Sequence, residues 1–177
     1  MTLPQISRLV RNIPDFPKPG IQFKDITPIL ANPEASRAVL QILKDQVKAF
    51  EVDAIVGIES RGFLFGMSLA QALNIPFIPV RKEGKLPAQI YQYSYDLEYG
   101  SSILEIHKDA LKGGERVLIH DDLLATGGTA MAAAELAKKA GGEIAGFSFL
   151  IELEFLSGRE KLLPFSQNIH TLLSYQS

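Results

Sequence analysis

The 177-residue chain contains no cysteine. This absence excludes disulfide bonds and catalysis by a thiolate, and it agrees with a reducing cytoplasm. Long apolar runs are also missing, since none approaches the roughly 20 residues that a membrane-spanning helix needs. Residues 1–13 lack the apolar core of a signal peptide. We therefore expect a cytoplasmic protein with no membrane partner.

The chain also lacks a large excess of positive or negative side chains. The chain has 18 basic and 20 acidic side chains and a net charge of −2, without a cluster of lysine and arginine. Binding to nucleic acid through its phosphates needs such a cluster, so we expect no nucleic-acid partner. Only three histidines occur, and no metal-ligand spacing is present. The 46% of hydrophobic residues are enough for the core of one domain.

The most informative segment that is present combines an apolar run, two acids and a loop of small residues. Residues 117–120 form the run, and Asp121 and Asp122 follow it. A stretch of helix formers comes after the loop. A strand, a loop and a helix in this order suit phosphate, because the amides and the positive dipole end of the helix meet there. The loop consists of Ala125, Thr126, Gly127, Gly128 and Thr129.

The two acids distinguish this loop from the commoner phosphate loops. Neither G-x-x-x-x-G-K-[ST] nor G-x-G-x-x-G after a strand occurs, and the loop has no lysine. Carboxylates repel phosphate but accept hydrogen bonds from vicinal hydroxyls. The pattern therefore favours a ribose 5-phosphate as ligand. The alternative is an ordinary strand-to-helix turn with solvated acids.

This segment closely resembles the signature with which type I phosphoribosyltransferases bind phosphoribosyl pyrophosphate (PRPP). Further strings resemble the adenine-using members of that family, in the family's order and over nearly the whole chain. The resemblance implies a single α/β domain (residues 1–177) with a mainly parallel central sheet flanked by helices. It also implies a small N-terminal hood (about 1–31) and a flexible active-site loop (about 81–106). The strings are residues 13–17, 19–20, 60–66, 84–87 and 97–100, and Gly158-Arg159-Glu160-Lys161-Leu162.

The family implies a reaction of adenine with PRPP that yields AMP and pyrophosphate, in purine salvage and in a homodimer. Asp121 and Asp122, ionised at neutral pH, would hold the ribose hydroxyls and stabilise an oxocarbenium-like transition state. The family's displacement inverts C1′ without a covalent intermediate, so the acids are not expected to be nucleophiles. Mg²⁺ would come with PRPP and be held mainly by it, without direct metal ligands from the protein.

Two further segments are expected at the pyrophosphate. Glu59, Ser60 and Arg61 follow a short apolar strand, where backbone amides and a guanidinium suit phosphate oxygens. Lys82 and Lys85 stand in the polar segment 81–100, which would act as a lid. In this family the peptide bond before the serine is often cis, so we expect a cis bond at Glu59–Ser60. A surface arginine and surface lysines on a solvated hairpin are the alternatives.

The base is expected to stack on Phe23, while backbone groups of Gln22 and Lys24 read its 6-amino edge. Gln22 stands where an aliphatic residue is usual in the family, and Lys24 where arginine is common. By the resemblance, Glu98 would accept the proton that leaves the purine, although a lone glutamate is more often solvated. His120 precedes the acids and is expected to be structural, facing away from Asp121.

The remaining pattern alternates strands and helices, which favours a parallel sheet with helices on both faces. Residues 89–95 and 102–106 are expected to pair as a hairpin. Asn32 is expected to cap a helix that runs to about residue 50, and Ser157 with Glu160 to form a capping box for a short helix ended by Pro164. A helical turn is expected near residues 6–11. Strands are expected at 54–58, 77–80, 117–120, 144–153 and, at an edge, 169–173.

Two other functions remain open from the sequence. A binding module of the same fold would sense PRPP and regulate transcription, but it would need a surface for nucleic acid. Another transferase of the family would act on hypoxanthine and guanine, on xanthine or on orotate. The segment around Phe23 favours adenine.

Overall fold

The computed structural model describes residues 1–96 and 100–176. Its contacts divide the chain into two compact units, Met1–Leu43 and Lys44–Ser177, and each unit is described by itself. No helix within the described ranges is long and apolar enough to cross a membrane.

The first unit contains short elements and a two-stranded antiparallel sheet among its described residues. Helix α1 is Leu3–Ser7, strand β1 is Arg11–Pro14, strand β2 is Gln22–Asp25 and helix α2 is Thr27–Leu30. The helical turn thus lies earlier than the predicted residues 6–11, because a proline in its first turn favours a helix start there. The pairing of β1 with β2, which puts Ile13 opposite Phe23, was not predicted.

Helix α3 (Pro33–Val47) starts in the first unit and ends in the second, followed by the 3₁₀ helix η1 (Lys48–Phe50). The side chain of Asn32 accepts hydrogen bonds from the amides of Glu34 and Ala35, at 3.0 and 3.1 Å. The predicted N-cap is therefore confirmed.

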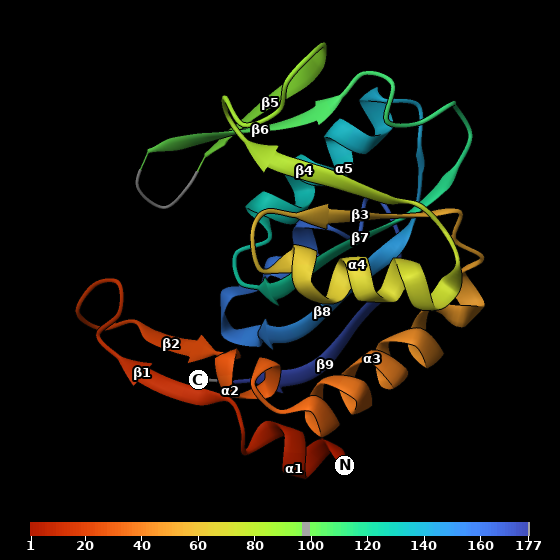
Figure 1. Cartoon of the computed structure of the whole chain (residues 1–177). Coiled ribbons are helices and arrows are strands. Elements are labelled where there is room, and N and C mark those ends of the chain that lie inside the picture. The colour runs from red at the N-terminus through yellow and green to blue at the C-terminus, as the bar shows by residue number, and fades with distance from the viewer. Residues whose placement is uncertain (97–99, 177) are drawn as a thin grey trace. The chain divides into compact units, whose positions relative to one another are not determined.

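The described part of the second unit is built on a seven-stranded sheet in the order β5-β6-β4-β3-β7-β8-β9 (Figure 1). The strands from β4 to β9 in this order run parallel, whereas β6 joins β4 antiparallel and forms a hairpin with β5. The mainly parallel sheet, the hairpin and the edge strand are confirmed. The strands are β3 (Ala54–Ile58), β4 (Phe77–Lys82), β5 (Ile90–Asp96), β6 (Ser101–His107), β7 (Arg116–Leu124), β8 (Glu143–Leu153) and β9 (Ile169–Tyr175).

Helices α4 (Gly62–Leu73) and α5 (Gly128–Lys139) cover opposite faces of this sheet (Figure 1). Successive side chains of a strand point to opposite faces. Val56 of β3 accordingly belongs to the core cluster that includes the alanines of α5, whereas Gly57 faces Gly62 of α4 and the ring of Phe77. The small residues of both helices let them lie close to the sheet.

Two 3₁₀ helices, η2 (Glu154–Leu156) and η3 (Gly158–Lys161), connect β8 with β9. The predicted capping box of Ser157 and Glu160 is wrong. Ser157 adopts a left-handed conformation with a φ of 51°, and its side chain makes no capping hydrogen bond. A capping residue needs extended backbone to aim its oxygen at the helix amides. The short helix is therefore a 3₁₀ helix that ends at Lys161, before Pro164.

Candidate active site

The two acids lie inside β7 rather than after it. The predicted strand ended at His120, but pairing with β8 extends it to Leu124. On the other side, β3 pairs with β7 only as far as His120. Asp121 and Asp122 therefore stand just beyond the part of β7 that pairs with β3. Asp122 is buried and Asp121 is partly exposed.

The small-residue loop is shorter than predicted, because α5 already begins at Gly128. Gly127 is the N-cap, with a φ of 77° that glycine adopts without steric cost. Gly128 and Thr129 thus belong to the first helical turn, whose amides have no partner within the helix. The hydroxyl of Thr129 lies 3.3 Å from that of Tyr95.

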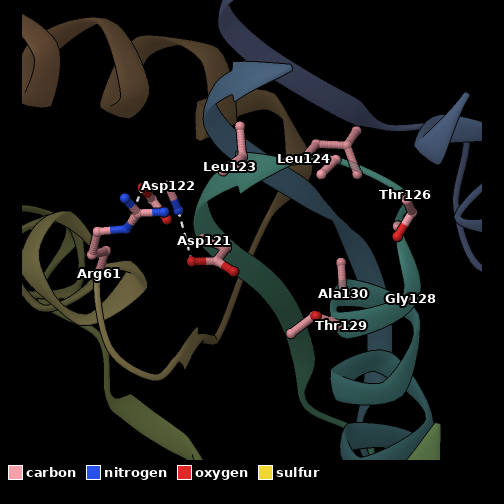
Figure 2. Close-up of a pocket in the computed structure, with 11 residues that line it drawn as sticks. Arg61, Asp121, Asp122, Leu123, Leu124, Thr126, Gly128, Thr129 and Ala130 are labelled. Atoms are coloured by element: carbon pink, nitrogen blue, oxygen red, sulfur yellow. Dashed lines mark hydrogen bonds and ion pairs between the residues drawn. The ribbon is translucent and has the colours of Figure 1, made fainter. Parts of the chain in front are cut away.

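The loop lines a cavity of about 190 Å³ (Figure 2). The loop contributes no basic side chain to this cavity, so its donors are the unpaired amides of the helix start and the hydroxyls of Thr126 and Thr129. Such a lining suits a phosphate group. Its described lining consists of Arg61, Asp121, Asp122, Leu123, Leu124, Ala125, Thr126, Gly127, Gly128, Thr129 and Ala130.

A second cavity, of about 360 Å³, adjoins the first, since Arg61, Asp121, Asp122 and Thr129 line both. The structure therefore brings together the residues that were predicted separately for ribose, 5′-phosphate and pyrophosphate. Lys82 reaches this cavity, whereas Lys85 is not among its described lining residues. The other lining residues are Glu59, Ser60, Lys82, Tyr95, Ser102 and Leu104.

The acids and Arg61 form one charged group (Figure 2). Nε of Arg61 lies 2.9 Å from Oδ2 of Asp122, and the amide of Asp122 donates to Oδ1 of Asp121 at 2.8 Å. Burial raises the pKa of Asp121 well above its usual value, and the charge of Asp122 adds to this. Burial also raises the pKa of Asp122, although Arg61 opposes the shift. Burial and the neighbouring acid thus raise the pKa values of the pair, while the ion pair with Arg61 favours the ionised form of Asp122.

Two cationic side chains and one backbone amide surround the carboxylate of Glu59. Lys85 Nζ lies 2.7 Å from its Oε1, Arg81 Nε lies 3.3 Å from its Oε2, and the Lys82 amide donates at 3.0 Å. Burial alone would raise the pKa of Glu59, but Lys85, Lys82 and Arg81 lower it to about 2. Because this carboxylate is ionised and repels phosphate, a contact of Glu59 with pyrophosphate would have to use its backbone. The Glu59–Ser60 bond is cis, as expected.

The residues expected at the base lie in the first unit, on β2. Phe23 packs edge-on against Phe16, with ring centroids 5.1 Å apart. Nζ of Lys24 donates to Oδ1 of Asn12 at 2.8 Å, and burial lowers its pKa. Gln22 and Lys24 are two residues apart in a strand, so their backbone groups point to the same side. Glu98 lies outside the described residues.

His120 is fully buried, as expected of a structural histidine, but its hydrogen bonding is incomplete, because its Nε2 has no partner among the described residues. Its Nδ1 lies 3.3 Å from Oγ of Ser148, and burial lowers its pKa to about 4. Tyr95 and Ser102, by contrast, line the second cavity but were not assigned to a site from the sequence. Their segment was predicted as a hairpin and as part of the active-site loop, but no role was assigned to these two side chains. In the described ranges no group of three or more His, Asp or Glu side chains is arranged to hold a metal ion.

Known proteins are similar to this chain over most of its length. The family model of the phosphoribosyl transferase domain matches residues 25–164. The adenine phosphoribosyltransferase of Cytophaga hutchinsonii is 52% identical over 170 residues, which make up 96% of this chain and 94% of that protein.

Solved structures are similar over the same length. The crystal structure of the adenine phosphoribosyltransferase from Thermoanaerobacter pseudethanolicus matches with a TM-score of 0.95 and 49% identity, covering 98% of this chain and 100% of that one. The enzyme from Saccharomyces cerevisiae, complexed with adenine and an imino-altritol bisphosphate, matches with a TM-score of 0.92 and 42% identity over 97% and 98% of the chains.

The chain therefore belongs to the phosphoribosyltransferase family and has its type I fold. Within that family it belongs with the adenine phosphoribosyltransferases, which are pentosyltransferases. This membership favours an enzyme over a regulator that senses PRPP, and adenine over the other bases.

Proposed function

We propose that the protein transfers the phosphoribosyl group of PRPP to adenine, with AMP and pyrophosphate as products, in purine salvage. The observation that carries the proposal is the pair of adjoining cavities that share Asp121 and Asp122. The first cavity has the neutral loop and the helix start, the second has Lys82 and the segment of Glu59 and Ser60, and Arg61 lines both. PRPP has the same order of groups: a 5′-phosphate, two ribose hydroxyls and a pyrophosphate.

In the proposed reaction N9 of adenine attacks C1′ while the bond between C1′ and the pyrophosphate oxygen breaks. The electron pair of that bond leaves with pyrophosphate, C1′ inverts, and the proton of N9 passes to Glu98. Positive charge develops on the ribose ring beside Asp121 and Asp122. Negative charge on the two carboxylates stabilises this cationic centre, and the centre in turn favours their ionised form against the effect of burial.

Mg²⁺ is proposed to enter with PRPP, held mainly by its oxygens and by water, with Asp121 and Asp122 within reach. Two carboxylates are too few for the six oxygen ligands that a dedicated magnesium site requires, so the donor set fits an ion that the substrate carries. When bound, the ion neutralises charge on the departing pyrophosphate. Lys82, and Lys85 once released from Glu59, would supply the remaining positive charge.

Adenine is proposed to stack on Phe23 and to meet backbone groups of Gln22 and Lys24. The relative from Saccharomyces cerevisiae was crystallised with adenine, which supports the same base here. A backbone site distinguishes adenine from hypoxanthine, because the 6-amino donor and N1 acceptor become an acceptor and a donor. Each mismatch leaves a buried polar group unpaired, at about 1–3 kcal/mol.

We also propose a cytoplasmic homodimer, as the family implies. Leu64 and Met67, three positions apart on α4, keep 46% and 45% of their surface exposed. Neighbouring exposed apolar side chains of this kind are typical of an interface. Light scattering would measure the molar mass, and Met67→Glu is expected to shift it to that of a monomer. A wild-type monomer would contradict the proposal.

The test of function is the release of pyrophosphate from PRPP and Mg²⁺ with adenine, hypoxanthine, guanine, xanthine and orotate in turn. We expect catalytic efficiency with adenine to exceed that with hypoxanthine at least about a hundredfold, from two mismatched hydrogen bonds. Comparable efficiencies would overturn the choice of base. Binding of PRPP without turnover of any base would favour the sensor.

A further inference from the structure

The string Gly158-Arg159-Glu160-Lys161-Leu162 has no role in the site described so far, yet its first residue lies directly behind the phosphate loop. A Cβ on Gly158 would overlap the carbonyl oxygen of Ala125 and lie 2.9 Å from the amide nitrogen of Gly127. A Cβ on Gly127 would in turn overlap the carbonyl oxygen of Gly158. The two backbone segments thus touch without room for a side chain between them.

Arg159 anchors this contact to the sheet. Its Nε donates to Oε1 of Glu152 at 3.0 Å, its Nη2 donates to Oε2 of the same carboxylate, and its Nη1 donates to the carbonyl oxygen of Ile169 at 2.9 Å. This two-pronged arrangement is the strongest geometry available to an arginine and a carboxylate. It ties η3 to β8 and to the start of β9.

Glu152, the partner of Arg159, is buried and lies next to the start of the small-residue loop. Only 5% of its surface is exposed, and Thr171 Oγ1 also donates to its carboxylate, at 3.1 Å. In the pairing of β7 with β8 it stands opposite Leu124, the last residue before the phosphate loop. The anchor of η3 and the start of the loop therefore lie on neighbouring, paired strands.

We propose that Arg159 and Glu152 are positioning residues for the 5′-phosphate of PRPP. They hold Gly158 as a rigid support behind residues 125–127, so that the loop amides keep the geometry that the phosphate needs. A loop without this support has to be ordered by its ligand, which lowers affinity. Neither side chain is among the described residues that line the two cavities, so the effect must pass through η3. The inference rests on the proposed function.

Three variants test the proposal. Arg159→Lys keeps the charge but loses the two-pronged contact, and Glu152→Gln keeps the shape but loses the charge. Gly158→Ala displaces the loop by steric overlap and leaves both side chains of the ion pair in place. We expect KM for PRPP and the Kd of ribose 5-phosphate to rise about tenfold, the equivalent of one charge-assisted hydrogen bond. We expect kcat at saturating PRPP and KM for adenine to stay within about twofold, which calorimetry and steady-state kinetics would measure.

Arg116→Lys is the matched control. Arg116 also bonds backbone carbonyl oxygens, those of Glu51 and Phe50 at 3.1 and 3.0 Å, but it stands at the start of β7, far along the strand from the loop. It should lose comparable stability without a change in KM for PRPP. An equal rise in KM for PRPP in the control would overturn the proposal. So would equal rises in KM for PRPP and adenine in the three variants, or unchanged binding of ribose 5-phosphate in all three.

Failure of the proposed function gives a different experimental result from failure of this inference. If the wild type binds ribose 5-phosphate but releases no pyrophosphate with any base, the enzyme assignment fails. The calorimetric comparison of the variants then still decides whether Arg159 and Glu152 support the phosphate loop.

Discussion

The guanidinium of Arg61 and the carboxylate of Asp122 form an ion pair, with Nε and Oδ2 2.9 Å apart. The arginine expected to hold pyrophosphate is therefore already paired in the ligand-free protein. Only about 6% of the Asp122 side chain is exposed, so removing Arg61 would leave an uncompensated buried charge. A substitution that tests the role of Arg61 in binding must keep its positive charge.

Arg61→Lys is expected to weaken binding of PRPP and of pyrophosphate about tenfold, while binding of adenine is unchanged. Lysine retains the partner of Asp122 but cannot bind phosphate oxygens with two parallel hydrogen bonds. Calorimetric titration of each ligand separately would measure the effect. Equal weakening of all three ligands would indicate a general disturbance of the fold.

The double variant Asp121→Asn with Asp122→Asn is expected to lose at least about a hundredfold in kcat, because negative charge beside the cationic transition state is removed. Its thermal unfolding temperature at pH 7 is expected to stay close to that of the wild type, because relief from burying two carboxyls opposes the loss of the ion pair with Arg61. Carboxyls whose pKa is raised in the folded state destabilise it as pH rises through that pKa. Turnover close to that of the wild type would remove the acids from the mechanism.

The contribution of Glu59 to the free energy of unfolding is expected to depend on pH. Its pKa is lowered from 4.5 to about 2 in the folded protein, so its contribution is complete above pH 4.5 and is lost as pH falls towards about 2. The difference in unfolding free energy between wild type and Glu59→Gln should therefore shrink over this interval, as urea unfolding at several pH values would reveal. Glu83→Gln, at an exposed glutamate in the turn after β4, is the control. A difference that stays constant down to pH 2 would refute this.

Glu98→Gln is expected to slow the chemical step by about 10²- to 10⁴-fold, the usual contribution of a general base. The amide keeps the size and hydrogen bonding of the side chain but cannot take the proton from N9, so affinity for PRPP should change little. Single-turnover measurement of AMP formation separates this step from product release. A rate within about twofold of the wild type would exclude proton transfer to Glu98.

The lid expected at residues 81–100 should gain protection from hydrogen exchange when PRPP binds. Part of the segment is anchored in the free protein, because Glu105, 1% exposed, accepts hydrogen bonds from the amides of Gly84 and Leu86 at 2.9 and 3.4 Å. These two amides should therefore exchange slowly without ligand. Hydrogen exchange of the segment would be measured by mass spectrometry with and without PRPP. Equal protection along the whole segment in both states would show that the segment is a static hairpin and not a lid.

Several features were predictable because they depend on neighbours along the chain. The cap at Asn32, the hairpin of β5 and β6, and the glycines that open α5 all follow from local backbone preferences. Apolar runs separated by helical stretches likewise indicated the parallel sheet. The same local signals indicated the phosphate loop beside two acids, and so the ligand class.

Other features depend on which segments pack together. The sequence of β7 suggested a strand that ends at His120, but pairing with β8 continues it through Asp121 and Asp122 to Leu124. The predicted capping box at Ser157 was wrong, because packing of Gly158 against the phosphate loop accompanies a left-handed turn there. Local patterns do not contain these constraints.

The sequence by itself determined the kinds of groups in the site: a neutral loop with glycines, two carboxylates, one arginine and nearby lysines. Only the tertiary structure decided how they are paired. Arg61 meets Asp122 because β3 and β7, far apart in the chain, are neighbours in the sheet. Glu59 and Lys85 meet because β3 also lies beside β4. Long-range strand order, set by the burial of both faces of the sheet, decides which charges are close enough to shift one another's pKa.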